Sequence, residues 1–152
     1  MKKFLISVLF LTFLIFACGE SEQKENKIIS TKEAPGAIGP YSQAIKSGNN
    51  LYVSGQIALD AGSGKLIEGG IKEQTHQTIK NIRTILSAAG YDLKDVVQCQ
   101  VFLANLNDYD EMNNVYVQYF KNQSPARAVV EVKRIPRDAL IEIMVVASKQ
   151  EE

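Results

Sequence analysis

Two segments of the chain carry apolar residues at the spacing of an amphipathic helix. Residues 71–89 have apolar or small side chains at every third or fourth position, and Gly90 follows where a helix commonly ends. Residues 109–121 repeat this pattern, and Asp108 with Glu111 three positions later predicts a capping box at the helix start. We therefore expect two helices that each bury one face. The predicted buried positions are Ile71, Thr75, Thr78, Ile79, Ile82, Ile85, Leu86 and Ala89 in the first helix, and Met112, Val115, Tyr116, Tyr119 and Phe120 in the second.

Strand patterns occupy most of the remaining chain. Residues 42–47 and 51–54 flank a Gly-Asn-Asn turn and predict a hairpin, and a further short strand can precede the first helix. Residues 96–103, 128–132 and 140–147 are rich in apolar and β-branched side chains and predict three more strands. This order indicates an α+β fold, a mixed sheet with two helices packed on one face. The other face then needs a cover, so we expect an oligomer.

The N-terminal segment has the pattern of an export signal. A basic start is followed by an apolar run at residues 4–17, which is shorter than the roughly 20 residues of a membrane span. Cys18 stands where the apolar run ends, as in a bacterial lipobox; ordinary cleavage with an incidental Cys18 is the alternative. We expect a signal peptide at 1–17, a flexible tether at 18–27 and a folded domain at 28–149. The chain would then be an exported, membrane-anchored lipoprotein, at the periplasmic face or the cell surface.

Composition excludes several classes of function. The 152 residues include 17 basic and 17 acidic side chains, and a formal net charge of zero argues against a nucleic-acid partner. One His and two Cys argue against a metal site with several such ligands. His76 falls between the apolar positions of the first helix and is expected to face solvent. Cys99 lies in an apolar strand and is expected to behave as a small hydrophobic residue.

Glu142 is the most informative candidate for chemistry. It interrupts an otherwise apolar strand, and alternation places it on one face with Met144 and Val146. A carboxylate among such neighbours is partly desolvated, which raises its pKa and suits it to general acid–base catalysis. The alternative is a Glu142 that is paired with a Lys or Arg or faces water at a sheet edge.

Arg127 is the candidate for binding an acidic substrate. It follows Pro125 at a strand start, and its guanidinium can hold a carboxylate through two hydrogen bonds. If the last two strands form a hairpin near Pro136, Arg127 lies opposite Val145, about 10 Å along the strand from Glu142. That gap could hold a small acid. A surface ion pair is the alternative role for Arg127.

Other candidates carry weaker signals. Pro40 fixes the approach to Tyr41, which can serve the core, an interface or a ligand. Ser54 and Gly55 end a strand, and Gly55 could let a ligand approach backbone N–H groups. Asn113 lies off the apolar stripe of the second helix, where solvent exposure is the simplest role.

Taken together, these segments resemble the Rid (YjgF/UK114) family of reactive intermediate deaminases. The resemblance covers nearly all of residues 28–149, in order and with few gaps. The segments that carry it are Ala37-Ile38-Gly39-Pro40-Tyr41-Ser42-Gln43-Ala44, Tyr52-Val53-Ser54-Gly55-Gln56-Ile57, Ala88-Ala89-Gly90, Val101-Phe102-Leu103, Leu106-Asn107-Asp108-Tyr109, Pro125-Ala126-Arg127, Val130-Glu131-Val132 and Ile141-Glu142-Ile143.

The resemblance implies a chorismate-mutase-like fold, a homotrimer with sites between subunits, and hydrolysis of enamines or imines to a 2-keto acid and ammonia. It implies no cofactor and no metal. By the same resemblance Arg127 grips the substrate carboxylate and Glu142 activates water. The remaining positions implied to line the cleft are Tyr41, Ser54, Gly55 and Asn113, together with the backbone at Val129, where family members often carry Cys.

Two other functions remain open at this point. The same cleft could bind a small carboxylic acid without turnover. A ribonuclease activity attaches to some relatives of this family, although the neutral charge and the single His speak against it here.

Overall fold

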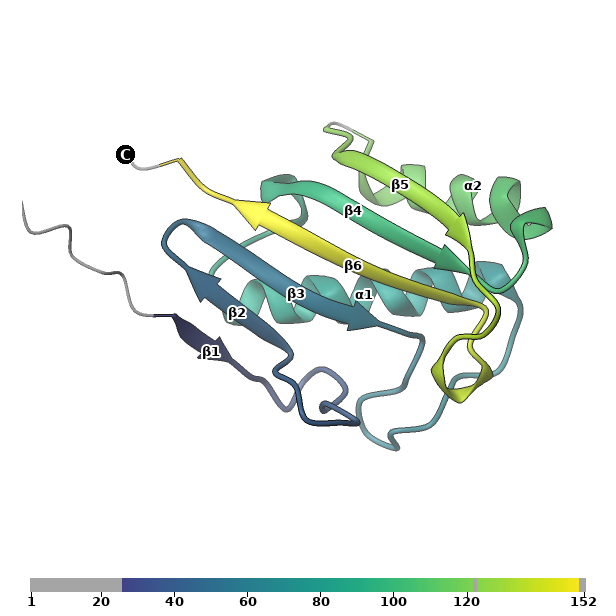
Figure 1. Ribbon diagram of the computed structural model, residues 1–152, viewed down its shortest axis with the longest axis horizontal. Coiled ribbons are helices and arrows are strands. Elements are labelled where there is room, and N and C mark those ends of the chain that lie inside the picture. Colours follow the sequence, from purple (N-terminus) through teal and green to yellow (C-terminus); the bar gives the residue numbers. More distant parts are fainter. Residues whose placement is uncertain (1–25, 122, 151–152) are drawn as a thin grey trace, which may run out of the picture.

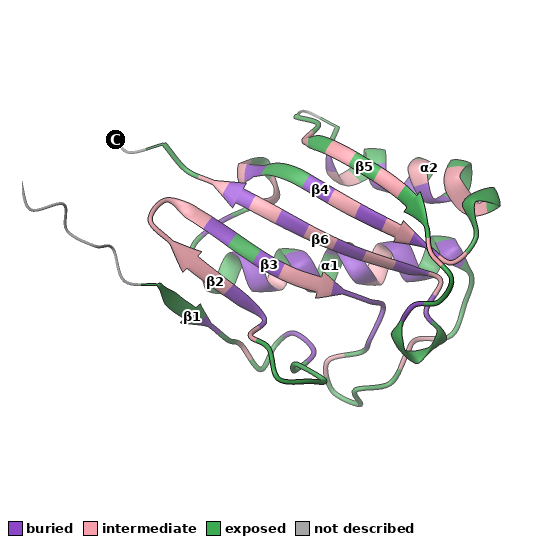
Figure 2. Ribbon diagram, viewed as in Figure 1, coloured by how far each residue is buried: buried purple, intermediate pink, exposed green. Residues whose placement is uncertain are grey.

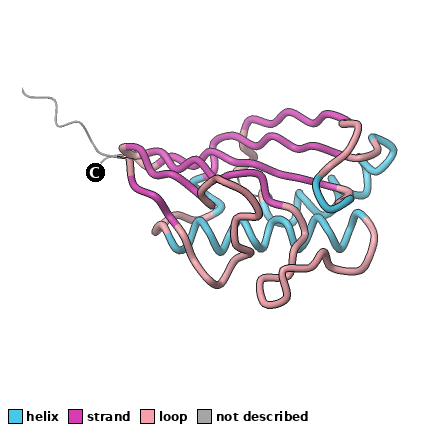
Figure 3. The backbone as a smooth tube through the Cα atoms, turned by 60° about the horizontal axis from the view of Figure 1, so that its bottom comes forward, coloured by secondary structure: helices cyan, strands magenta, loops and turns pink. Residues whose placement is uncertain are grey.

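A six-stranded mixed sheet covered on one face by two helices forms the part of the chain that the structure describes (Figures 1 and 3). The computed structural model describes residues 26–121 and 123–150. The predicted signal peptide, Cys18 and most of the tether lie outside these ranges. In chain order the elements are β1 (Lys27–Ile29), β2 (Ala44–Ser47), β3 (Asn50–Gln56), α1 (Ile71–Ala88), η1 (Leu93–Asp95), β4 (Val96–Leu103), η2 (Leu106–Asp108), α2 (Tyr109–Tyr119), β5 (Ala126–Glu131), η3 (Pro136–Asp138) and β6 (Ile141–Ser148).

The strand order β1-β2-β3-β6-β4-β5 confirms the α+β fold and the first hairpin. The expectation that the last two strands pair with each other is wrong. β4 lies between them, antiparallel to β6 and parallel to β5. The cause is α2, which returns the chain across the sheet so that β5 starts at the same end as β4, as parallel pairing requires.

Both predicted helices form, with small differences at their ends. α1 ends at Ala88 and Gly90 follows with a φ of 78°, the left-handed conformation that glycine adopts readily after a helix. α2 ends at Tyr119, two residues before the predicted end. The predicted capping box at Asp108 is absent, because Asp108 still belongs to η2 and its N–H donates to Asn105 O rather than its side chain capping α2.

The core lies between the sheet and the helices. The apolar face of α1 and the residues of β4 and β6 that point toward it are almost fully buried (Figure 2). His76 differs from expectation: it is half-buried, with Nδ1 2.9 Å from the Tyr119 hydroxyl, because α2 packs against this part of α1. No helix within 26–121 and 123–150 has the length and apolarity to cross a bilayer.

The opposite face of the sheet has no covering layer in the described chain. Alternation along β6 buries Ile141, Ile143 and Val145 under the helices and turns the residues between them to this open face. Large apolar side chains remain exposed there, including Tyr52 at 48% and Val130 at 45%. An apolar face of this kind is typical of a surface that contacts another subunit.

Candidate functional site

Glu142 stands near the start of β6 in an apolar setting. Its neighbours Ile141 and Ile143 are buried under the helices, so the Glu142 side chain lies on the other face of the sheet. It is half-buried, and this burial raises the pKa of the carboxyl group. Among the described residues it has neither an ion-pair nor a hydrogen-bond partner. Within residues 26–121 and 123–150, the alternative of a Glu142 held by Lys or Arg is therefore wrong.

Gly55 provides the space that the Glu142 carboxylate occupies. The pairing of β3 with β6 shifts register between Val53 and Gln56, and this irregularity brings Gly55 against Glu142. A Cβ atom on Gly55 would collide with Glu142 Oε1 and lie 2.9 Å from Cδ. Glycine is thus required here by close approach rather than by an unusual φ.

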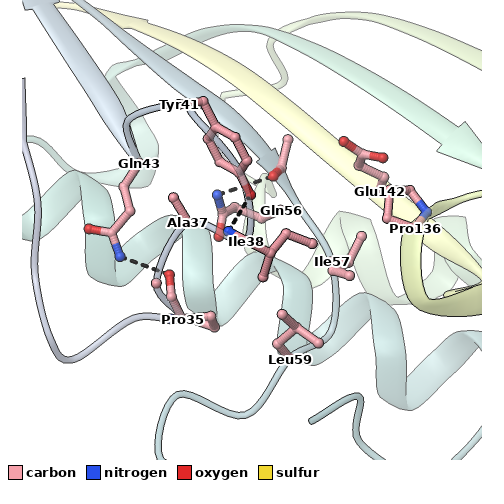
Figure 4. A pocket seen from close by; sticks show the side chains of 12 residues that line it. Pro35, Ala37, Ile38, Tyr41, Gln43, Gln56, Ile57, Leu59, Pro136 and Glu142 are labelled. Atoms are coloured by element: carbon pink, nitrogen blue, oxygen red, sulfur yellow. Dashed lines mark hydrogen bonds between the residues drawn. The ribbon is translucent and has the colours of Figure 1, made fainter. Parts of the chain in front are cut away.

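A small cavity opens beside Glu142 (Figure 4). Its volume is about 50 Å³, well below the roughly 300–1,000 Å³ of a complete small-molecule site. Tyr41 lines the cavity, and its hydroxyl accepts a hydrogen bond from Ile38 N at 3.2 Å. Ser54 does not line it; its hydroxyl donates to Ser42 O at 2.7 Å. The lining residues are Pro35, Gly36, Ala37, Ile38, Tyr41, Gln43, Gly55, Gln56, Ile57, Leu59, Pro136 and Glu142.

Arg127 lies elsewhere, on the edge strand β5, with its side chain against α2. Its Nη1 donates to Asn113 Oδ1 at 2.8 Å and its Nη2 to the Tyr109 hydroxyl at 3.3 Å. The guanidinium carbon is 4.4 Å from the centroid of the Tyr116 ring, a cation–π contact. No carboxylate of a described residue forms a salt bridge with Arg127, so the surface ion pair is wrong within one chain.

The contacts of Arg127 with Tyr109 and Tyr116 were not predicted from the sequence. Tyr109, Asn113 and Tyr116 are spaced i, i+4 and i+7, which places them on one face of α2. That spacing is the signal that could have identified them. It also corrects the simplest role given to Asn113, whose side chain is half-buried and bonded to Arg127.

Val129 and Cys99 complete the surroundings of Arg127. Val129 lies two residues further along β5 and borders, with Tyr109 and Leu106, an open groove at the sheet edge. Cys99 is the register partner of Arg127 on β4 and is fully buried, and burial raises the pKa of its thiol to about 11. This confirms Cys99 as a small core residue.

Within one chain the Glu142 and Arg127 clusters do not share a cleft. Arg127 pairs with Cys99 and Cys99 with Val145, which places Glu142 two strands across and three residues along. At standard sheet spacings this is about 14 Å between Cα atoms, with the side chains on opposite faces. The expectation of a 10 Å gap on one surface is wrong, because β4 separates the two strands.

The described residues contain no cluster of three or more His, Cys, Asp or Glu side chains that could hold a metal ion. What the fold does present is one acid–base group in a small hollow and one oriented cation at the sheet edge. An acid–base group can transfer protons, and an oriented cation can hold a carboxylate.

Known proteins share both the sequence and the fold. A family model described as "Endoribonuclease L-PSP" matches residues 31–149. A RutC family protein of Pyrococcus horikoshii is 51% identical over 124 residues, covering 82% of this chain and 98% of the relative. The human 2-iminobutanoate/2-iminopropanoate deaminase is 49% identical over 121 residues, covering 80% of this chain and 88% of the relative.

A solved structure extends the similarity to the whole fold. The crystal structure of Escherichia coli TdcF with bound serine is 37% identical, with a TM-score of 0.78, and the match covers 82% of this chain and 99% of that one. With a family model over nearly all of the folded domain and relatives near 50% identity, the chain belongs to the Rid/YjgF/L-PSP family.

Proposed function

We propose that the protein is a hydrolytic deaminase that converts 2-imino acids, and the enamines in equilibrium with them, to 2-keto acids and ammonia. The observation that carries the proposal is the Glu142 carboxyl group, which is half-buried, has no partner in the described chain and lies beside Gly55 in a small hollow with both polar and apolar lining residues. A carboxyl group in this setting is suited to accept a proton from water and to return it.

Glu142 would activate the attacking water. The carbon of a protonated imine is electrophilic, and water attacks it while one water proton passes to Glu142. The same proton then moves to the nitrogen of the tetrahedral carbinolamine. The C–N bond then breaks as the new hydroxyl becomes the keto oxygen, and the proton that this hydroxyl loses passes to the departing ammonia, which leaves as ammonium. Water supplies the oxygen, and Glu142 ends the cycle as it began.

Arg127 would orient the substrate through its carboxylate. Nη1 uses one N–H to bond Asn113, and Nη2 uses one to bond Tyr109. The guanidinium group has five N–H donors, so three remain for a ligand. The Tyr116 ring supports the flat guanidinium from one side. Such a pre-oriented cation binds a carboxylate at low entropic cost. The backbone at Val129, which borders the groove at the same sheet edge, would extend this contact.

We infer that each complete site combines Glu142 of one copy with Arg127 of another. Three observations support this: the two groups lie on opposite sheet faces, the hollow at Glu142 is far smaller than a complete site, and the open sheet face exposes apolar side chains. A cyclic homotrimer, as the family resemblance implies, would bring the edge strand of one copy to the hollow of the next. Tyr41 and Gly55 would contribute from the Glu142 side and Asn113 from the Arg127 side.

The relatives support the proposed substrate class. The human relative is named for 2-iminobutanoate and 2-iminopropanoate, and the E. coli TdcF structure holds serine. Serine has the same arrangement of a carboxylate beside a carbon that carries nitrogen. The apolar lining around Glu142, which includes Ile57 and Pro136, suits a short aliphatic side chain.

Ammonia release from an imine generated in place tests the proposal. A threonine or serine dehydratase supplies the imine, and the protein is expected to raise the hydrolysis rate above the uncatalysed rate. Replacing Glu142 by Gln should abolish the increase while the protein still binds 2-oxobutanoate. Binding of 2-oxobutanoate with no acceleration by the unaltered protein would instead establish a non-catalytic acid-binding protein.

We also propose that the protein is exported and anchored to a membrane through lipidated Cys18. β1 begins at Lys27, in the register row of Ala147, which is five residues along β6 from Glu142. Lys27 is also three strands across from β6, so the tether would join the domain about 22 Å from Glu142, toward the opposite end of the sheet. Cys18→Ser should move the protein from the membrane fraction to the soluble fraction and abolish labelling by a fatty-acid analogue. Unchanged fractionation and labelling would refute lipid anchoring.

A further inference from the structure

The hollow beside Glu142 is built largely by two walls that lie outside the sheet. One wall is residues 35–41, between β1 and β2, and the other is residues 57–59, directly after β3. Figure 4 shows side chains of both walls turned toward the same space. The second wall forms an isolated antiparallel bridge between Leu59 and Leu66, and Ile67 N donates to Ala58 O at 3.0 Å. Neither wall belongs to the six-stranded sheet, so side-chain contacts also contribute to its position.

Gln43 fastens the base of the first wall. Its side chain is 4% exposed and lines the hollow. The amide Nε2 donates to Thr31 O at 3.0 Å, to Pro35 O at 2.8 Å and, at a longer 3.4 Å, to Ala34 O. Oε1 accepts from Thr31 N at 2.6 Å. One carboxamide therefore ties the whole turn at 31–35, from which the wall rises, to the start of β2.

Asn81 fastens the second wall in the same manner. It lies on α1, and its side chain is 3% exposed. Nδ2 donates to Ile57 O at 3.1 Å and to Leu59 O at 2.9 Å, while Oδ1 accepts from Gln77 Nε2 at 2.9 Å. The carbonyls that it holds belong to the two residues whose apolar side chains line the hollow.

We propose that Gln43 and Asn81 are positioning residues that set the separation of the two apolar walls and thereby the size of substrate side chain accepted next to Glu142. This inference rests on the proposed function, because it takes the Glu142 hollow as part of the substrate site. Neither side chain contacts the reacting atoms. Gln43 acts through the buried carbonyls of the turn at 31–35. Asn81 adds a second donor to Ile57 O, which also accepts from Leu59 N at 2.8 Å. It also bonds Leu59 O at 2.9 Å, closer than the 3.5 Å contact from Gln77 Nε2.

An isosteric substitution separates positioning from general stability. Gln43→Glu keeps the acceptor for Thr31 N but, when ionised, turns a second oxygen toward three carbonyls. Protonation restores one donor, so the defect should shrink as the pH falls. The charged residues of the adjoining turn, Lys32 and Glu33, are shared with the unaltered protein, as is Glu142. The ratio of variant to unaltered protein at each pH therefore isolates the change made at position 43.

The expected result in the full-length protein is a change in KM without a change in kcat. At pH 8 the KM for 2-iminobutanoate and the Kd for 2-oxobutanoate should rise about tenfold, the scale of one methylene contact in a fitted pocket, while kcat stays within about twofold. At pH 6 the KM of the variant divided by the KM of the unaltered protein should fall toward one. Pyruvate, which is one methylene shorter, should be affected less. Asn81→Asp, which alters the contacts of the second wall, should show the same rise in KM at pH 8 and the same decrease of that effect at pH 6.

Two further variants make the outcome decisive. Gln74→Glu buries a carboxylate at another 4% exposed glutamine while keeping its acceptor for Leu140 N, so it should leave the KM ratio unchanged. Gln43→Met removes the bonds without adding charge and should raise KM at every pH. A folded Gln43→Met with unaltered KM and Kd would overturn the proposal. So would loss of folding in all three wall variants while Gln74→Glu folds.

The Kd measurement also separates this proposal from the proposed function. It requires no turnover, so a protein that binds 2-oxobutanoate but releases no ammonia would refute the deaminase while leaving the wall positions testable. Normal imine hydrolysis by the unaltered protein, with no change in KM or Kd in Gln43→Met, would support the deaminase and refute the role of Gln43 in positioning the wall.

Discussion

The strongest consequence of the fold is that two inactive variants should restore each other. Arg127→Ala removes the oriented cation, and Glu142→Gln removes the acid–base group. Each alone is expected to lower the catalysed rate by about 10²- to 10⁴-fold, the usual contribution of such a group. If a site takes Glu142 from one copy and Arg127 from the next, a mixed oligomer contains sites in which both groups are intact.

The size of this recovery follows from the arrangement. With equal amounts of the two variants and random mixing in a cyclic assembly, half of the Glu142 sides and half of the Arg127 sides are intact. About a quarter of all sites are then complete, whatever the number of subunits in the ring. The co-expressed pair should therefore show about a quarter of the unaltered rate of ammonia release.

A second mixture provides the matched control. The double variant, with both substitutions in one chain, is co-expressed in equal amount with the unaltered chain. A site shared between copies again gives about a quarter of the rate, whereas a site within one chain gives about a half. Two outcomes would refute the shared site. In one, neither mixture releases ammonia faster than the single variants; in the other, the control mixture reaches one half of the unaltered rate while the first mixture shows no recovery.

Three further predictions test single features of the site. Gly55→Ala should displace the Glu142 carboxylate and reduce kcat by about 100-fold. Gly62→Ala, whose new Cβ would lie no closer than 3.6 Å to Asp60 Oδ1, should have little effect, and equal kcat values would contradict the contact. Because burial raises the pKa of Glu142, ionisation costs stability as pH rises through that pKa, so the melting temperature of Glu142→Gln should exceed that of the unaltered protein by more at pH 7.5 than at pH 4. A constant difference would argue against this burial. Cys99, buried with a thiol pKa near 11, should resist alkylation at pH 8 until the protein is denatured, and a reactive thiol in native, membrane-extracted protein would indicate an unmodified Cys18.

Local patterns predicted the elements well because each pattern reports on its own segment. The helical spacing in 71–89 and the apolar run at 96–103 depend only on which side chains face the core, and both elements form within a residue of the prediction. The pairing of β5 with β4 depends instead on where α2 returns the chain. No local pattern encodes that, which is why the final hairpin was wrong.

The site residues differ in the same way: some could be identified from a local pattern, and others depend on contacts that exist only in the folded chain. Glu142 was identifiable because a carboxylate inside an apolar strand is conspicuous. The partners of Arg127 were not identified, since they lie on a helix that meets β5 only in the folded chain. Gln43 and Asn81 were missed for a similar reason: an amide that bonds backbone carbonyls 8 to 24 positions away leaves no periodic signal.

The register of the sheet argues against a site within a single chain. Arg127 is level with Val145 through Cys99 on β4, and Glu142 is three residues from Val145. Side chains an odd number of residues apart point to opposite faces of a sheet unless a bulge intervenes. The only irregularity between β4 and β6 falls between Val96 and Gln98, outside the stretch that joins Arg127 to Glu142. The opposite orientation of the two side chains therefore supports the proposal that a cleft containing both groups takes them from different copies.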